Sequence, residues 1–261
     1  MAEPLLSLTH VYKSFGGLKA VADLNFDVYA GRVTGLIGPN GAGKTTALNL
    51  IAGELHPDRG AITFDGQRLD RLEPYQVAHA GLARTFQLAR ELGTLTVLEN
   101  LLVAPHPQIG EGLLAAVMRP KSVREQEDRL RERARDLLRL VGLRDLRNER
   151  AANLSGGQKK LLELARAMMV RPKLLLMDEP AAGVNPALME RLVEHIRHLR
   201  DEMHVSVLVI EHNLSVIESL CEDVIVMATG TVLARGTMAE LRGNTDVVEA
   251  YLGEGRAHGA L

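Results

Sequence analysis

The 261-residue sequence has little of several features that mark particular classes of protein. Aromatic residues make up 3% and tryptophan is absent, which disfavours the base-stacking surfaces of proteins that bind single-stranded nucleic acid. The formal net charge of -2 is also far from the broad positive field of a dedicated nucleic-acid binder. We therefore expect no nucleic-acid partner.

Cysteine and long apolar segments are equally scarce. The one cysteine, Cys221, allows no internal disulfide, which fits a reducing compartment, and its neighbours Leu220 and Val224 indicate a small buried side chain. No run reaches about 18 apolar residues and no basic segment precedes an apolar one at the N-terminus, so neither a membrane span nor a secretory signal is expected. Any role at a membrane must then come through a partner.

Hydrophobic residues make up 46% of the chain, enough for one large domain or for a core with an inserted subdomain. Apolar and polar side chains alternate over residues 5–11 and 20–28, which predicts paired strands. Between residues 88 and 154 the pattern becomes helical, with a long charged helix over 122–141. Short β-rich runs then alternate with helical segments, which predicts a parallel, doubly wound sheet.

The run Gly38-Pro39-Asn40-Gly41-Ala42-Gly43-Lys44-Thr45-Thr46 fits the phosphate-binding loop pattern G-x-x-x-x-G-K-[ST] completely. It follows a β-rich run at 32–37 and leads into a helix at 45–52, which is the context that this motif requires. Glycines let backbone N–H groups turn toward phosphates, and the helix offers its positive end. We expect Lys44 to reach the β- and γ-phosphates of a nucleoside triphosphate and the Thr45 hydroxyl to coordinate Mg²⁺.

Asp178 and Glu179 end an apolar run that begins at Leu174. We expect this strand to lie beside the strand that leads into the phosphate loop. Asp178 then fits the carboxylate that holds Mg²⁺ through water, and Glu179, one residue further, fits the group that polarises the attacking water.

A second glycine-containing helix start occurs at Leu154-Ser155-Gly156-Gly157-Gln158. Ser155 stands at a capping position, and the two glycines expose backbone N–H groups to an anion. One γ-phosphate does not need two such cradles from one molecule.

The order of these three motifs resembles the ATP-binding cassette (ABC) ATPases. The resemblance implies an α/β P-loop NTPase (RecA-like) core with an N-terminal antiparallel β subdomain and an inserted α-helical subdomain. We expect one domain over residues 5–253, and a flexible tail follows at 254–261. The core takes 1–87 and 159–253 and the helical subdomain about 88–158.

The resemblance also implies roles for single residues. Gln87 matches the family's glutamine loop, which touches Mg²⁺ or water, and His212 matches the switch histidine at the γ-phosphate. Phe15 matches the aromatic residue that stacks on adenine, with Tyr12 as the competing choice. In this family, the Ser155–Gln158 segment of one subunit holds ATP against the phosphate loop of another.

Several segments look like the ATPases of branched-chain amino acid importers, although relatives that move urea, short amides or aromatic acids would suit them too. One departure is Asn185, where most ABC ATPases have an aspartate that contacts the opposite subunit; this leaves that contact open. The similar segments are Arg84–Gln87, Val97–Ala104, Asp178–Pro186 and Ala250–Gly253.

The resemblance thus implies an ATPase with ATP and Mg²⁺ as cofactors that energises a solute importer at the cytoplasmic face of a membrane. Its partners would be integral-membrane permeases, a second ATPase of the same or a paralogous chain and, indirectly, a solute-binding protein. The alternatives are a stand-alone cassette of a lipid or lipopolysaccharide exporter, an ABC ATPase acting on nucleic acid or ribosomes, and a clamp that does not hydrolyse ATP. The transported solute is left open.

Overall fold

The computed structural model describes residues 3–85, 92–105 and 121–257 and divides into two compact units. We call them the sheet unit (Met1–Gln87, Lys173–Gly183 and Ile196–Leu261) and the helical unit (Leu88–Pro172 and Val184–His195). Within the described ranges, no helix is both long enough and apolar enough to cross a membrane.

The sheet unit contains a six-stranded sheet in the order β10-β9-β3-β8-β7-β6. Every residue of its three central strands is buried, as expected for apolar strands covered on both faces. The predicted parallel sheet is confirmed, with β10 added antiparallel to β9 at one edge. Its strands are β3 (Val33–Ile37), β6 (Leu82–Arg84), β7 (Leu174–Asp178), β8 (Ser206–Ile210), β9 (Asp223–Ala228) and β10 (Thr231–Gly236).

The prediction that the strand of Asp178 lies beside the phosphate-loop strand is wrong, because β8 separates β7 from β3. Ile210 of β8 is in register with Leu36 of β3 on one side and with Asp178 of β7 on the other. β8 is buried throughout, so a central position suits it. Two interstrand spacings, about 10 Å, therefore separate the ends of β3 and β7.

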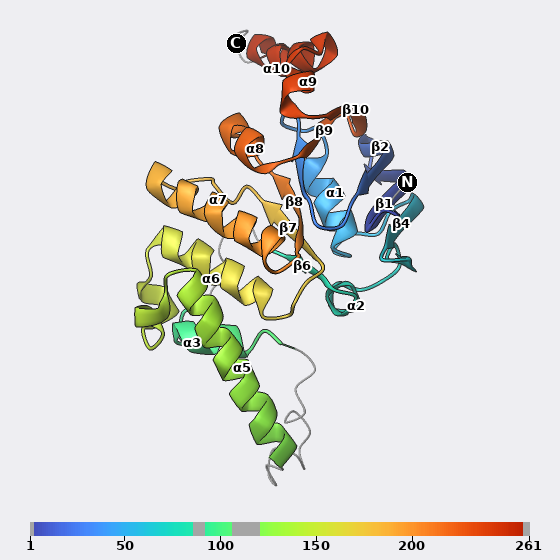
Figure 1. Cartoon of the computed structure of the whole chain (residues 1–261). Helices are drawn as coiled ribbons and strands as arrows, with labels where there is room; N and C mark the ends of the chain where they lie inside the picture. Colours follow the sequence, from blue (N-terminus) through green and yellow to red (C-terminus); the bar gives the residue numbers. More distant parts are fainter. Residues whose placement is uncertain (1–2, 86–91, 106–120, 258–261) are drawn as a thin grey trace. The chain divides into compact units, whose positions relative to one another are not determined.

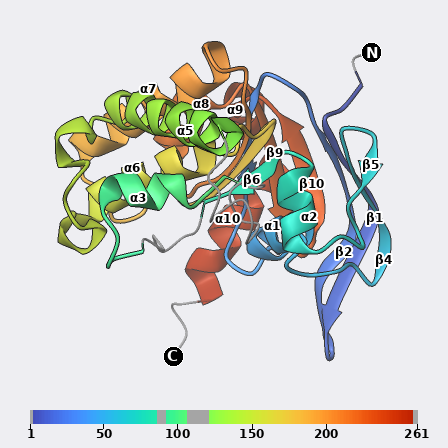
Figure 2. The same cartoon turned by 90° about the horizontal axis from the view of Figure 1, so that it is seen from below.

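The sheet unit also contains a four-stranded antiparallel sheet in the order β2-β1-β4-β5, which is formed by the N-terminal part of the chain. α1 (Lys44–Ile51) lies between the two sheets in both views (Figures 1 and 2), and apolar side chains of both sheets and of α1 form one core. The predicted N-terminal antiparallel portion is thus confirmed. Its strands are β1 (Leu6–Phe15), β2 (Leu18–Val28), β4 (Arg59–Phe64) and β5 (Gln67–Arg68).

Further helices lie wholly or partly in the sheet unit. Cys221 directly follows α8, and burial raises the pKa of its thiol to about 12, which agrees with a packing role for this side chain. α7 begins in the helical unit and ends in the sheet unit. The helices are α2 (Pro74–His79), α7 (Pro186–Asp201), α8 (Leu214–Leu220), α9 (Met238–Arg242) and α10 (Thr245–Ala257).

The helical unit is built on α3 (Val97–Leu102), α5 (Lys121–Leu140) and α6 (Gly156–Met168), which pack against one another (Figure 1). α5 buries Val123, Ala134, Leu137 and Leu138, while its charged face makes local ion pairs such as Arg131 with Glu127 at 3.2 Å. Such exposed pairs contribute little to stability and identify this face as solvated. Two short 3₁₀ turns, η2 (Arg144–Leu146) and η3 (Ala151–Asn153), connect α5 to α6.

Candidate nucleotide-binding and active site

The phosphate loop joins β3 to α1 and requires glycine at two close contacts. Gly38 has φ of 149°, and a Cβ there would lie 2.0 Å from the carbonyl oxygen of Met227. Gly43 has φ of 97°, and its Cβ would lie 2.4 Å from the carbonyl oxygen of Ala20. A side chain at either position would clash with backbone, so these glycines keep the loop tight against its neighbours.

Lys44 occupies the inside of this loop. Its side chain is only 6% exposed, and Nζ donates hydrogen bonds to the carbonyl oxygens of Gly38 and Pro39, both at 2.8 Å. α1 begins at Gly43 without a side-chain cap, and Thr45 and Thr46 lie in its first turn. The loop therefore joins a buried ammonium to a helix start that is suited to an anion.

Asp178 ends β7 and is 3% exposed. Burial raises the pKa of this carboxyl, and the positive charge of Arg84 opposes that effect. Arg84 Nη2 donates to Asp178 Oδ2 at 3.2 Å. The charges of Lys44 and Glu179 also act on the pKa of Asp178, so the phosphate-loop lysine and the two carboxylates share one electrostatic environment.

Glu179 has a left-handed backbone with φ of 50°, which is uncommon for a residue other than glycine. Its N–H donates to the carbonyl oxygen of Ile210 at 2.9 Å, and its Oε1 lies 2.7 Å from Nε2 of His212. Strained backbone of this kind is often kept at functional sites, where it aims a side chain. The structure thus brings together the predicted carboxylate and the predicted histidine, which are 33 positions apart in the chain.

Two residues that connect segments of this site by hydrogen bonds were not predicted from the sequence. Arg84 contacts Asn49 at 2.6 Å and Glu54 at 3.1 Å in addition to Asp178, so it joins the end of β7 to α1 and the turn after it. No motif signals this role, because its partners lie far away in the sequence.

Glu211 is the second missed residue. It is buried and directly follows β8, where its Oε1 accepts a hydrogen bond from the Ala181 N–H at 2.6 Å and its Oε2 accepts one from the His212 N–H at 3.2 Å. This carboxylate fixes the turn after Glu179 against the turn that carries His212. A carboxylate directly before the predicted histidine was the one available signal.

The two aromatic candidates for adenine differ in exposure. Phe15 is 47% exposed at the end of β1, with Lys13 Nζ 5.8 Å from the centre of its ring, so it is not a core side chain. Tyr12 is half-buried, and burial raises the pKa of its hydroxyl, with nearby Asp23 adding to the effect. The exposed ring of Phe15 is the better placed of the two for stacking on a base.

The Leu154–Gln158 segment lies in the helical unit. Ser155 caps α6, because its Oγ accepts a hydrogen bond from the Gln158 N–H at 3.3 Å and its own N–H donates to Gln158 Oε1 at 2.9 Å. The predicted helix start and capping residue are confirmed. At Gly157 an added Cβ would lie 1.9 Å from Cδ2 of Leu188, so close packing within the unit also favours glycine there.

Asn185 and Gln87 are the remaining positions that the sequence singled out. Asn185 caps the start of α7, because its Oδ1 accepts a hydrogen bond from the Leu188 N–H at 2.9 Å. The local role of Asn185 therefore needs no second subunit. Gln87 lies outside the described residues.

The parallel sheet, the glycine loop around Lys44 and the paired Glu179 and His212 define a P-loop nucleotide-binding ATPase. Residues 21–182 match the family described as ABC transporter, and residues 231–257 match the family described as branched-chain amino acid ATP-binding cassette transporter. The chain therefore belongs to the ABC transporter ATP-binding proteins, in their branched-chain amino acid group.

Individual relatives agree with this assignment. The Escherichia coli K12 high-affinity branched-chain amino acid transport ATP-binding protein LivG is 41% identical over 97% of this chain and 100% of its own length. A probable LivG of Archaeoglobus fulgidus is 41% identical over 95% of each chain. A crystal structure of the ADP conformation of MJ1267, an ATP-binding cassette of an ABC transporter, is 36% identical and covers 97% of this chain and 100% of that one with a TM-score of 0.82. As an ABC transporter ATPase, the chain binds nucleotide and acts with membrane permease subunits.

Proposed function

We propose that this ATPase energises the uptake of branched-chain amino acids, or of a related small solute, from the cytoplasmic face of a membrane. The relatives named as branched-chain amino acid transport proteins support this cargo, and they disfavour the exporter and nucleic-acid alternatives. The observation that carries the catalytic part of the proposal is the 2.7 Å contact between Glu179 Oε1 and His212 Nε2 in the same electrostatic environment as Lys44.

In the proposed mechanism, the N–H groups of the phosphate loop and Lys44 bind the β- and γ-phosphates and stabilise charge on the transferred phosphoryl group. Glu179 polarises the attacking water, and His212 holds Glu179 and the γ-phosphate in place. Phe15 stacks on adenine. Glu211 and Arg84 position this machinery without touching the reacting atoms. We assign Gln87 a contact with Mg²⁺ or with water. This role rests on the family resemblance alone.

Magnesium fits this donor set. Thr45 offers a hydroxyl in the first turn of α1, and Asp178 offers a buried carboxylate whose pKa senses the charge of Lys44. Mg²⁺ is commonly bound by one or two protein oxygens together with substrate phosphates and water, so no larger cluster of carboxylates is needed. When bound, Mg²⁺ would neutralise phosphate charge, and Thr45 and Asp178 would hold it.

We further propose that Ser155, Gly156, Gly157 and Gln158 contact ATP held by a second cassette, either an identical chain or a paralogue. The working assembly would then be two cassettes with two permease subunits and, indirectly, a solute-binding protein. We also propose that residues from about 88 to 158 form the inserted helical subdomain. The remainder of 5–253 would then form the catalytic core.

Substitution of Glu179 by Gln tests the catalytic assignment. The amide keeps the size of the side chain but removes the charge that polarises water, so phosphate release should fall by about 100-fold or more while ATP affinity stays within about twofold. Gel filtration of this variant with ATP should show a dimer. Equal rates of phosphate release for wild type and E179Q would refute the role of Glu179, and a strictly monomeric E179Q with bound ATP would refute the shared site.

A further inference from the structure

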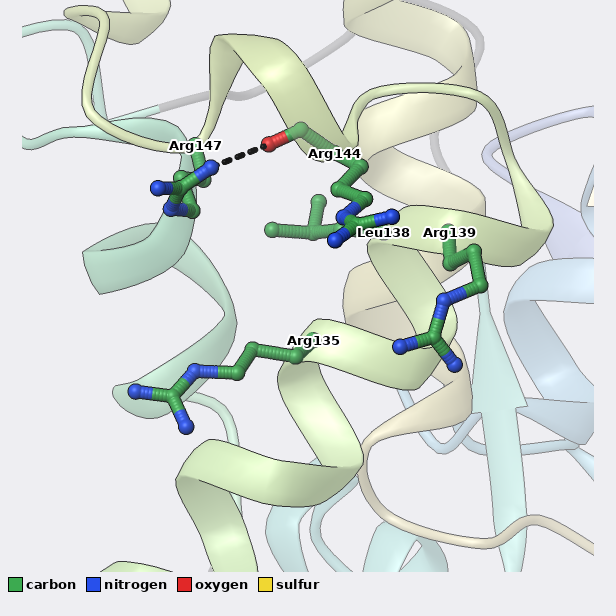
Figure 3. A pocket seen from close by; sticks show the side chains of 5 residues that line it. All are labelled: Arg135, Leu138, Arg139, Arg144 and Arg147. Carbon is green, nitrogen blue, oxygen red and sulfur yellow. Dashed lines mark hydrogen bonds between the residues drawn. The ribbon is translucent and has the colours of Figure 1, made fainter.

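The helical unit has a hollow whose charged lining residues are all arginines, and none of them has a role assigned above. The hollow has a volume of about 270 Å³ and is lined by Arg135, Leu138, Arg139, Arg144 and Arg147. Figure 3 shows that two of the arginine side chains come from α5 and two from the turn that includes η2. Four arginines therefore line one small space.

The sequence places these arginines together by simple geometry. Arg135 and Arg139 are four residues apart on α5 and so share one face of the helix. Gly142, with φ of 71°, then turns the chain, and a Cβ there would lie 2.6 Å from Nη2 of Arg191. Arg144 and Arg147, three residues apart across η2, return toward the same space.

The positive charges of the hollow are only partly balanced. Arg139 pairs with Asp136 at 3.0 Å, but both side chains are about 60% exposed, so this pair contributes little. Arg147 donates a weak hydrogen bond of 3.4 Å to the Arg144 carbonyl oxygen. Within the part of the chain that the structure describes, Arg135 and Arg144 make no ion pair. Like charges held around one space repel, and a bound anion would relieve that repulsion.

The ordinary explanation for terminal arginines covers only part of this arrangement. A cation in the last turn of a helix interacts favourably with the helix dipole, which accounts for Arg139 at the end of α5. It does not account for Arg144 and Arg147, which follow the helix and face the same hollow. The presence of both pairs along one hollow needs a different explanation.

We propose that this hollow, which we call the arginine pocket, binds a phosphate-bearing anion. Guanidinium groups bind phosphate through paired N–H donors, and a phosphate group offers three oxygens and up to two charges to several of them at once. The volume lies just below the range of about 300–1,000 Å³ that is usual for small-molecule pockets, so the ligand is compact. A free diphosphate and the phosphate headgroup of an anionic lipid share this chemistry.

The full chain, saturated with ADP in Mg²⁺-free buffer so that the phosphate loop is filled, tests the proposal. Isothermal titration calorimetry with inorganic diphosphate measures binding of a soluble phosphate ligand. Sedimentation with phosphatidylcholine vesicles that contain phosphatidic acid measures binding of a lipid headgroup. The pocket variant combines R135Q with R144Q. The control variant combines R124Q with R129Q, which removes the same charge from exposed positions of α5 outside the pocket.

Wild type should bind at least one of the two probes, and the pocket variant should bind it about tenfold or more weakly, because two charge-assisted hydrogen-bonding groups are lost. The control variant should stay within twofold. A variant with R135K and R144K, which keeps charge but loses the fork geometry, should be intermediate and serves if the glutamine variant fails to fold. Unchanged ATPase rates verify folding, since none of these arginines belongs to the catalytic site.

Binding of diphosphate supports a soluble ligand, and binding of vesicles alone supports a lipid headgroup. Citrate, a polyvalent anion without phosphate, is titrated as a further control. Three results would overturn the proposal: no binding of either probe, an equal loss of binding in the pocket and control variants, or binding of citrate as tight as that of diphosphate.

Discussion

Two helices of this protein begin at glycine-containing turns, but the contacts that hold them differ. α1 starts at Gly43 with no side-chain cap, and the site around it is tied by contacts across long stretches of chain. Arg84 and Asp178 are 94 positions apart, and Glu211 and Ala181 are 30 apart. α6 starts at Ser155, and its cap is made with Gln158, three residues later. One helix start depends on the whole sheet unit, whereas the other is completed by its own first turn.

The difference separates two ways of presenting N–H groups to an anion. At α1, a buried lysine and uncapped N–H groups gather positive charge that a phosphate can satisfy. At α6, the side chains of Ser155 and Gln158 already accept hydrogen bonds from the backbone N–H groups of the N3 and N-cap positions. The Leu154–Gln158 segment contains no lysine or arginine that could match the buried Lys44 of α1. We infer that α1 supplies most of the binding energy for ATP and that α6 adds contacts to a phosphate that is already held.

Replacement of Lys44 by Ala should give the largest effect on this contrast. The variant loses the one ammonium inside the loop, so the rate of phosphate release should fall by about 100- to 1,000-fold and ATP affinity should fall as well. Steady-state ATPase assays and binding of a fluorescent ATP analogue measure both. K121A removes the same charge at an exposed position of α5 and should leave both unchanged. Near-normal ATP binding by K44A would show that α1 is not the dominant anion site.

Replacement of Arg84 by Gln tests whether long-range contacts hold the α1 site. Asp178 would stay buried without its guanidinium partner, and breaking such a pair costs about 3 kcal/mol of unfolding free energy. Urea denaturation measures this loss, and the KM for MgATP should rise because Asp178 is no longer oriented. R235Q, which breaks the Asp223 pair at the sheet edge, should reduce stability without changing KM. A similar KM for R84Q and wild type would remove Arg84 from the site.

A smaller effect is expected from Glu211 to Gln, which tests the second long-range contact. The amide can still accept one of the two N–H donors, of Ala181 and of His212, so the other loses its partner. An unsatisfied buried donor costs about 1–3 kcal/mol, and kcat should fall because His212 is less well held. Denaturation and kcat are compared with E202Q, an exposed glutamate in the same unit. An unchanged kcat with reduced stability would limit Glu211 to a structural role.

The same contrast explains which features the sequence could predict. The phosphate loop, the cap at Ser155 and the apolar run of β7 are local patterns, and the structure has each of them where the pattern placed it. Arg84 and Glu211 depend on strands brought together by the sheet, so no spacing along the chain indicates their partners. Strand order failed for the same reason. The pairing of β8 between β3 and β7 follows from tertiary packing of strands that are all apolar.

Ser155 to Ala probes the local side of the comparison and should have the smallest effect on stability. Loss of the hydroxyl removes the cap on the Gln158 N–H, which costs about 1 kcal/mol, while S155T restores most of it. Urea denaturation of monomeric protein without nucleotide measures this difference. If Ser155 only caps α6, the ATPase rate at low temperature should depend only on the folded fraction of each variant. S155T and wild type should then have equal rates. If α6 also contacts a phosphate across a dimer, S155A should lose ATPase activity even where it is fully folded, and dimer formation with ATP in the E179Q background should weaken in parallel. Full activity and full dimer formation by S155A would confine this helix start to its structural role.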